Sequence, residues 1–250
     1  MSKEVCTMSI IFNVQYSVFA NNRIEPTPDN IGKTLKRLNE LGSYSFLPNM
    51  INGQNIDIVA GVMNPVNNIS FVSLDRQVQI ACMNDRLDAV MNGTPQNQSL
   101  SIGKRLEFSE KILGFLMDEY HIYSNRLAIN VSLLSNLIEK PIQETCLGKN
   151  MYKALDFYNG KTVDEWSSRT NSRQTIQMAQ EELLNVITEL SVVTDNMTKK
   201  NRFMCHMDIN TVFENGGYRF ASADLGLFRE KVLVIVNEIK NNFEGLDNEY

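Results

Sequence analysis

The chain has 250 residues, of which 43% are hydrophobic and 21% are charged. A chain of this length folds as one large domain or two small ones, and this composition is typical of a folded globular protein. The formal net charge of −5 argues against a general nucleic-acid binder, because such proteins gain most of their affinity by neutralising phosphates with basic side chains.

The sequence predicts a cytoplasmic protein that does not enter a membrane. No stretch approaches the roughly eighteen consecutive apolar residues that cross a bilayer. The N-terminal segment contains Glu4 and interrupts its apolar run at Asn13, unlike a signal peptide. The cysteines are widely spaced and form no CxxC pair: Cys6, Cys82, Cys146 and Cys205. This spacing favours reduced thiols over a disulfide framework.

The first predicted element is a half-buried strand over residues 8–18. Apolar residues occupy its even positions, with Ile11 as an exception on the odd ones: Met8, Ile10, Phe12, Val14, Tyr16 and Val18. Such a period of two is typical of a strand with one buried face. A helix follows over residues 27–42, where Thr27 is the expected N-cap, Pro28 the first helical residue and Gly42 the stop.

The rest of the first half alternates strands with a second helix. We expect a strand over 55–60, then one long strand or a tight strand pair over 69–83, rich in β-branched residues. The second helix covers 99–122. The segment 126–134 returns to a period of two, with these residues facing inward: Leu127, Ile129, Val131 and Leu133.

A connector over 138–150 separates two halves, 1–137 and 151–250, because it contains Pro141 and Gly148 and shows no periodicity. After it, residues 151–158 are typical of a short helix. The polar segment 164–178 fits an exposed strand or a loop. Residues 181–196 fit either a strand or a helix, and we favour the strand because their C-terminal part is β-branched.

The chain ends with a predicted hairpin over 203–220 and a helix over 222–245. Alternating apolar residues and the Asn215-Gly216-Gly217 turn signal predict the hairpin. Together the elements predict an α+β fold, in which antiparallel sheets carry helices packed on one face. The similar order of strands and helices in 1–137 and 151–250 leaves open an internal duplication of two similar halves.

The segment Cys205-His206-x-Asp208 is the first candidate site. On a strand, His206 and Asp208 share one face while Cys205 points to the other, so the three side chains do not converge locally. We expect Cys205 in the core and the other two on a polar face. If the protein is an enzyme, His206 and Asp208 are the catalytic candidates. The sequence has no HxxxH, CxxC, GxxxxGK[ST], GxGxxG or GxSxG motif, so we expect no metal and no cofactor.

The second candidate is an interaction surface that contains Trp166, Arg169 and Arg173. A lone tryptophan beside two arginines and several hydroxyl groups is a composition that protein interfaces favour, and arginines also grip phosphates. The alternative is a solvated polar strand or loop. A small basic cluster at 199–202 most simply lies in a solvated turn.

Three segments, SIIFNVQYSVF, RLAINVSLL and MCHMDIN with the following GYRFASADLGLFREKVLVIVNEI, resemble an uncharacterised bacterial family of similar length in element order and hydrophobic pattern. Members of that family are sporadically distributed and are often encoded beside mobile-element or phage-defence genes. The resemblance implies an accessory role in such a system, and it implies no catalytic residue.

The sequence therefore favours a non-catalytic protein that works through protein–protein contact, as an accessory or sensor. A homodimer is expected because the edges of open antiparallel sheets need to be covered or paired. The alternative is an enzyme that acts on nucleic acid or another phosphoester, in which folding brings His206 and Asp208 together with Arg169 and Arg173.

Overall fold

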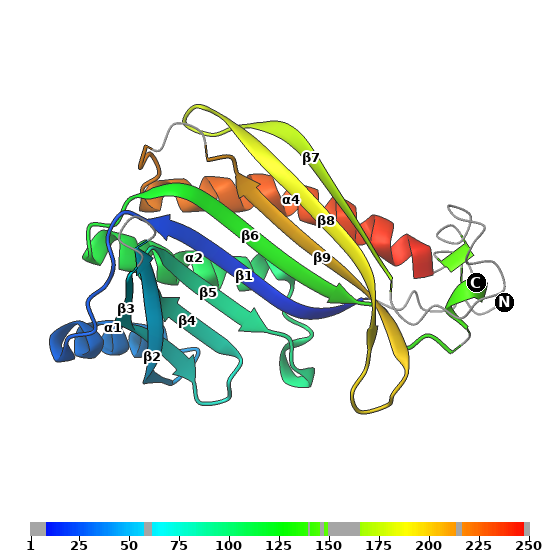
Figure 1. Ribbon diagram of the computed structural model, residues 1–250, viewed down its shortest axis with the longest axis horizontal. Helices are drawn as coiled ribbons and strands as arrows, with labels where there is room; N and C mark the ends of the chain where they lie inside the picture. Colours follow the sequence, from blue (N-terminus) through cyan, green and yellow to red (C-terminus); the bar gives the residue numbers. More distant parts are fainter. Residues whose placement is uncertain are drawn as a thin grey trace.

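The computed structural model describes residues 9–57, 62–139, 141–145, 148–149, 166–213 and 217–247. Within these ranges the chain forms one antiparallel sheet and three α-helices (Figure 1). The strands are β1 (Ile10–Ala20), β2 (Phe46–Asp57), β3 (Val62–Ser73), β4 (Val78–Cys82), β5 (Arg86–Asn92), β6 (Ser124–Leu134), β7 (Ser167–Gln177), β8 (Glu181–Thr194) and β9 (Asn201–Thr211). The helices are α1 (Pro28–Glu40), α2 (Ile102–Glu119) and α4 (Ser222–Asp247). The predicted α+β class is confirmed.

The nine strands lie in the order β2-β3-β4-β5-β1-β6-β9-β8-β7. The pairing of β1 with β6 joins the N-terminal strands to the C-terminal ones at the centre of the sheet. On each side, a meander of consecutive strands ends with a strand that returns to the centre: β5 pairs with β1, and β9 pairs with β6. Strands from both sides of the connector 138–150 therefore belong to one sheet.

The centre of the sheet follows the predicted alternation. In β1, Val14, Tyr16 and Val18 are fully buried. The Tyr16 hydroxyl donates a hydrogen bond of 2.8 Å to the backbone oxygen of Leu225 in α4, and its ring contacts that of Phe228. The expected inward residues of β6 are all fully buried: Leu127, Ile129, Val131 and Leu133.

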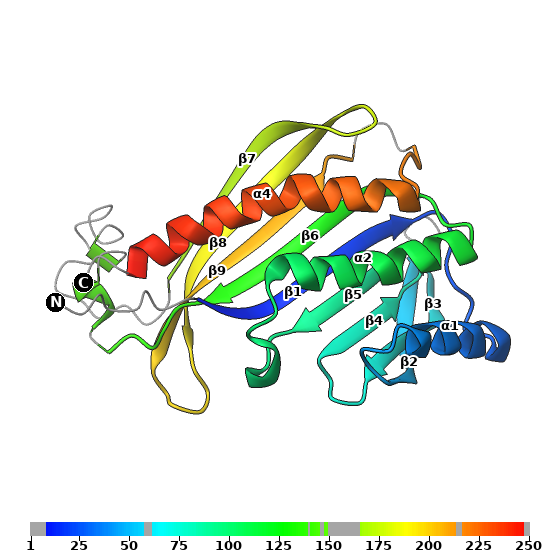
Figure 2. The same ribbon diagram turned by 180° about the vertical axis from the view of Figure 1, so that it is seen from behind.

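All three helices lie on the same side of the sheet (Figures 1 and 2). Helix α2 packs against β1 and β5, and α4 packs against β6 and β9. Helix α1 lies beside the C-terminal part of α2, where the Thr34 and Tyr120 hydroxyls share a hydrogen bond of 2.6 Å. No described helix covers the opposite side, which we call the open face (Figure 1).

Most boundaries agree with the sequence signals. Thr27 caps α1 by accepting a hydrogen bond from the backbone N–H of Asn30, and Gly42 beyond its end has a φ of +72°. The segment 69–83 is a strand pair, because β3 and β4 are separated by a turn. The segments 164–178 and 181–196 hold the strands β7 and β8. The expected helix over 151–158 lies outside the described residues.

The expected inward position of Phe12 is wrong. A β-bulge in β1 between Ile11 and Asn13 shifts the alternation by one residue, so Ile11 is buried and Phe12 is 53% exposed. The Gln98 side-chain amide satisfies both backbone groups of Ile11, accepting from its N–H at 3.1 Å and donating to its carbonyl at 3.0 Å. An extra residue in one strand is what a bulge provides, and a single-residue shift exchanges the two faces.

The hairpin predicted over 203–220 is also wrong. Strand β9 pairs with β6 on one side and with β8 on the other, so neither of its edges is left for the segment after it. Phe220 instead forms an isolated bridge with Ser124 at the start of β6, and Phe213 and Tyr218 are exposed. The alternation of apolar residues correctly predicted the strand β9, but it did not identify the strands with which β9 pairs.

The strand expected over 55–60 is longer, since β2 begins at Phe46, and β5 was not predicted.

Beside β5 lies Arg105 of α2, which is fully buried. Its guanidinium donates hydrogen bonds to the backbone oxygens of Leu100, Asn92 and Asn97, at 3.1, 3.3 and 2.7 Å. Burial lowers the pKa of Arg105, and the convergent carbonyls compensate for the lost water.

We expect Gly93→Ala to destabilise the protein. A Cβ at this position would lie 1.7 Å from the Ile11 carbonyl oxygen, beside the bulge, so the backbone would have to shift. The expected loss is about 1–3 kcal/mol in the free energy of unfolding, measured by urea denaturation.

Gly32→Ala is the matched control, because a Cβ added at this position in α1 would meet nothing within 4 Å. This substitution should stabilise the protein by up to about 1 kcal/mol through helix propensity. Equal midpoints for Gly93→Ala and the unsubstituted protein would contradict the role assigned to Gly93.

Candidate functional site

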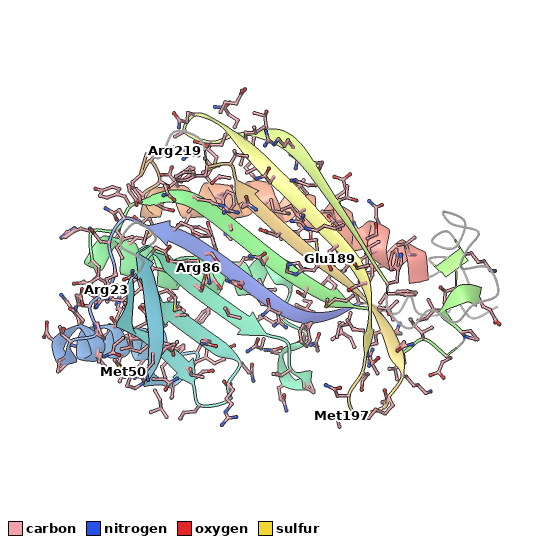
Figure 3. All side chains as sticks on the ribbon, viewed as in Figure 1. Arg23, Met50, Arg86, Glu189, Met197 and Arg219 are labelled. Atoms are coloured by element: carbon pink, nitrogen blue, oxygen red, sulfur yellow. The ribbon has the colours of Figure 1, made fainter. Side chains whose placement is uncertain are left out.

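The open face carries most of the polar side chains of the central strands. Residues that oppose each other in neighbouring antiparallel strands project to the same face of a sheet. In one such row, Arg169 of β7 lies opposite Glu189 of β8, and Glu189 lies opposite His206 of β9. His206 in turn lies opposite Ser132 of β6. Figure 3 labels Glu189 within this row.

His206 and Asp208 lie in neighbouring rows of the open face, as predicted, and both are half-buried. The Ser132 hydroxyl lies 2.9 Å from His206 Nδ1. Asp208 accepts a hydrogen bond of 2.9 Å from the side-chain amide of Asn210, whose own oxygen accepts one of 3.2 Å from Asn185. A cross-strand contact therefore orients His206, whereas Asp208 is held by a hydrogen bond along β9 from Asn210, which is itself bonded across to β8.

Cys205 points to the opposite side of β9, as expected, and is fully buried. Burial raises the pKa of its thiol to about 12. Cys82 of β4 is buried as well, and burial followed by the nearby Asp88 carboxylate raises its pKa to about 12. Both thiols are therefore protonated at neutral pH, and a thiol in this state is a poor nucleophile and a poor metal ligand.

The structure brings the two predicted arginines to the open face together with His206 and Asp208. Arg173 lies opposite Asn185, two rows along β7 from the row of Arg169. Both arginines are exposed, while Trp166 is half-buried and directly precedes β7. The alternation of the strand places Trp166 on the other face, so the tryptophan and the arginines do not form one surface.

A second polar cluster on the open face was not predicted from the sequence. The Asp88 carboxylate in β5 is almost fully buried and accepts hydrogen bonds from Ser17 at 2.6 Å and from Gln15 at 3.0 Å. Arg86 forms an ion pair of 2.9 Å with the same carboxylate. The period of two in β1 could have identified Gln15 and Ser17, but nothing in the sequence paired them with Asp88.

Next to this cluster, Phe19 lies between two arginines. The Arg126 guanidinium lies over its ring at 4.9 Å from the ring centre, and that of Arg86 lies at 5.8 Å. Within the part of the chain that the structure describes, the buried Arg126 Nε has no hydrogen-bond partner. The three residues form a cationic and aromatic corner of the open face (Figure 3 labels Arg86).

Two cavities lie at the rim of the sheet rather than beside His206. They measure about 480 and about 230 Å³, and both are lined by Gln180, Glu182 and Arg219. Arg219 forms a bidentate ion pair with Glu182 at 3.0 and 2.8 Å and also donates to the backbone oxygen of Asn125 at 2.7 Å. Burial opposes the ionisation of Glu182, but the hydrogen bonds from Arg219 and Gln180 outweigh it and lower its pKa.

The basic cluster at 199–202 is partly neutralised. Lys200 forms an ion pair with Glu139, and Arg202 forms one of 3.2 Å with Asp195. Backbone hydrogen bonds from the turn, the one from Thr198 first, lower the pKa of Asp195 to about 2. These pairs hold the turn between β8 and β9 and explain the charges without a ligand.

The described residues contain no group of three or more histidine, cysteine, aspartate or glutamate side chains that could hold a metal ion. None of the described helices is long and apolar enough to span a bilayer. No protein-family model matches the chain, and no curated protein matches its sequence. The geometry of the open face and its edges is therefore the basis for the functional proposal.

We expect Glu182→Gln to lower the free energy of unfolding by about 3–5 kcal/mol near neutral pH, because it leaves the Arg219 charge without its carboxylate. The folded-state pKa of Glu182 is lowered, so its contribution is present above the ordinary value of 4.5 and is lost as pH falls through the folded value. The difference between the variant and the unsubstituted protein should therefore shrink in acid.

Urea denaturation at about pH 7 and about pH 3.5 tests this expectation. Glu139→Gln is the control, since its ion pair with Lys200 is exposed and should contribute less than about 1 kcal/mol. A Glu182→Gln difference that stays constant over this pH range would show that the carboxylate is not stabilised by Arg219.

Proposed function

We propose that this protein is a non-catalytic binding protein that recognises a partner protein through the open face of its sheet. The observation that carries the proposal is the segregation of the fold: three helices cover one face of a nine-stranded sheet, and the other face keeps an ordered polar surface. Polar networks held by cross-strand hydrogen bonds lose little side-chain entropy on binding, and so favour recognition.

The proposal includes a cytoplasmic location and an accessory or sensor role in a bacterial defence or mobile-element system. The support for that role is the resemblance carried by the segments around β1, β6 and β9 with α4. We also propose that the chain consists of two related halves. The support for this is a similar strand arrangement: β5 ends one meander by pairing with β1, and β9 ends the other by pairing with β6, which precedes the connector.

A second candidate function is an enzyme that acts on nucleic acid or another phosphoester. The observation that favours it is the common face of His206, Asp208, Arg169 and Arg173, together with the 2.9 Å contact between Ser132 and His206. One observation weighs against it: Asp208 is already engaged by the side-chain amide of Asn210.

The binding proposal predicts that substitutions in the centre of the open face abolish partner binding without unfolding the protein. Asn130 of β6 and Gln79 of β4 are half-buried, and each lies in the row that contains Gln15. Asn130→Arg with Gln79→Arg should weaken binding by at least about tenfold, through bulk and unpaired charge. The partner is first identified by affinity purification from the native host and then titrated in purified form by calorimetry.

Lys104→Arg with Lys111→Arg is the control, because these lysines lie on the exposed surface of α2. Both double variants should retain the thermal midpoint of the unsubstituted protein. Binding that is unchanged by the open-face substitutions, or equally lost in the α2 control, would contradict the proposed surface.

The two candidate functions are separated by an activity assay. Labelled DNA and RNA incubated with the protein and Mg²⁺ or Mn²⁺ should show no turnover. Cleavage that disappears in His206→Ala or Asp208→Ala, while both variants keep their thermal midpoint, would support the enzyme instead. The Ser132→Ala variant tests the hydroxyl that contacts the imidazole.

A further inference from the structure

Strand β7 is a sheet edge that nothing described covers. It is the last strand in the sheet order and pairs only with β8. The pairing runs without a bulge from Ser167 opposite Ser191 to Gln177 opposite Glu181. Every residue of β7 is exposed except Ile176, which is half-buried. Figure 1 shows β7 along the outer margin of the sheet.

The backbone of β7 presents alternate residues to solvent. The backbone N–H of Val192 donates to the Trp166 oxygen at 3.1 Å, and that of Met178 donates to the Gln180 oxygen at 3.0 Å. In an antiparallel ladder, residues of the same parity direct both backbone groups to the same neighbour. Even-numbered residues of β7 therefore face β8, while Arg169, Asn171 and Arg173 direct their N–H and carbonyl groups outward.

Native proteins usually protect such an edge with proline, a bulge, charges or a covering segment. The sequence of β7, SSRTNSRQTIQ, contains no proline and no acidic residue. Its only charges are Arg169 and Arg173, and neither forms an ion pair with any described residue. The edge thus combines outward backbone groups that are unpaired among the described residues with two arginines that form no ion pair there, although Arg169 lies opposite Glu189.

We propose that the outer edge of β7 accepts an extended segment of the partner protein as an additional strand, and that this segment carries acidic side chains. The inference rests on the proposed binding function and names the element and the chemistry that the partner offers. Backbone hydrogen bonds to the outward groups of β7 supply affinity, and side chains on alternate positions supply specificity.

The spacing of the arginines defines the acidic segment. Arg169 and Arg173 are four residues apart on one face, about 13 Å along the strand. Acidic side chains four residues apart in the added strand would lie opposite both guanidinium groups. Carboxylates paired with arginine in this way form charge-assisted hydrogen bonds, which are stronger than those between neutral groups.

A second copy of the chain is a poorer partner for this edge. Antiparallel self-pairing centred on Asn171 would place Arg169 directly opposite Arg173 of the other copy. Pairing shifted by one step in either direction would place the arginines diagonally next to each other. Like charges at these positions destabilise a strand pair. The two arginines therefore act against self-association at β7 and in favour of an acidic segment.

The test is a selection of phage-displayed random linear peptides, about as long as β7, on the immobilised full-length protein. Enriched peptides should lack proline and carry acidic residues four positions apart. Asn171→Pro removes an outward N–H without removing a bond to β8, so it should weaken binding of the selected peptides by at least about tenfold. Arg169→Glu with Arg173→Glu should abolish that binding and select basic peptides instead.

Lys36→Glu with Lys231→Glu is the matched control. It changes the net charge by the same amount as the double arginine variant, but at exposed positions of the helices α1 and α4. It should leave peptide binding unchanged. The inference is overturned if no peptide is enriched, or if the selected peptides bind the β7 variants as well as the control. A native partner that is lost on Asn130→Arg with Gln79→Arg but retained by the β7 variants would overturn this inference alone.

Discussion

The pairing of β1 with β6 is the constraint on which the rest of the fold depends. It places the returning strands β5 and β9 on either side of the β1–β6 pair, and β9, which follows the connector 138–150, joins the sheet through β6. Because α2 and α4 each pack on their own half from the same side, one face becomes a continuous core. The Tyr16 hydroxyl donates a hydrogen bond to the Leu225 backbone oxygen and so connects β1 to α4 across that core. The opposite face is then left to polar side chains.

The buried face and the open face of the sheet are stabilised by different interactions. The buried face gains stability from apolar area removed from water, whereas the open face is held by hydrogen bonds such as those of Asp88 with Ser17 and Gln15. A surface held this way is suited to recognition, because its donors and acceptors are already oriented. The exposed arginines of β7 extend that surface to the edge of the sheet, where no described residue pairs with the outward backbone groups.

Sequence periodicity predicted the elements better than their partners. The alternation of Leu127, Ile129, Val131 and Leu133 identified β6 and its buried face, and Thr27 and Gly42 marked the ends of α1. Alternation does not specify which strand lies alongside, so the hairpin expected at 203–220 was wrong. Alternation also does not reveal the β-bulge that brings Phe12 to the surface. At that bulge Gly93 leaves room for the Ile11 carbonyl, and the Gln98 side chain accepts a hydrogen bond from the Ile11 N–H. The shared face of His206 and Asp208 followed from parity, but Ser132 and Asp88 became neighbours of their partners only through long-range pairing.

The sheet order also determines which strand edges stay unpaired while the chain is being synthesised. The meander from β2 to β5 closes on β1 through nearby residues, so the N-terminal half is able to assemble early. The other edge of β1 stays unpaired until Ser124–Leu134 has been synthesised, and β6 in turn waits for β9. At translation rates of about 5–20 residues per second, a hydrophobic strand edge is therefore exposed for seconds. The nascent chain is most prone to aggregate during this interval, and a chaperone that shields β1 would act there.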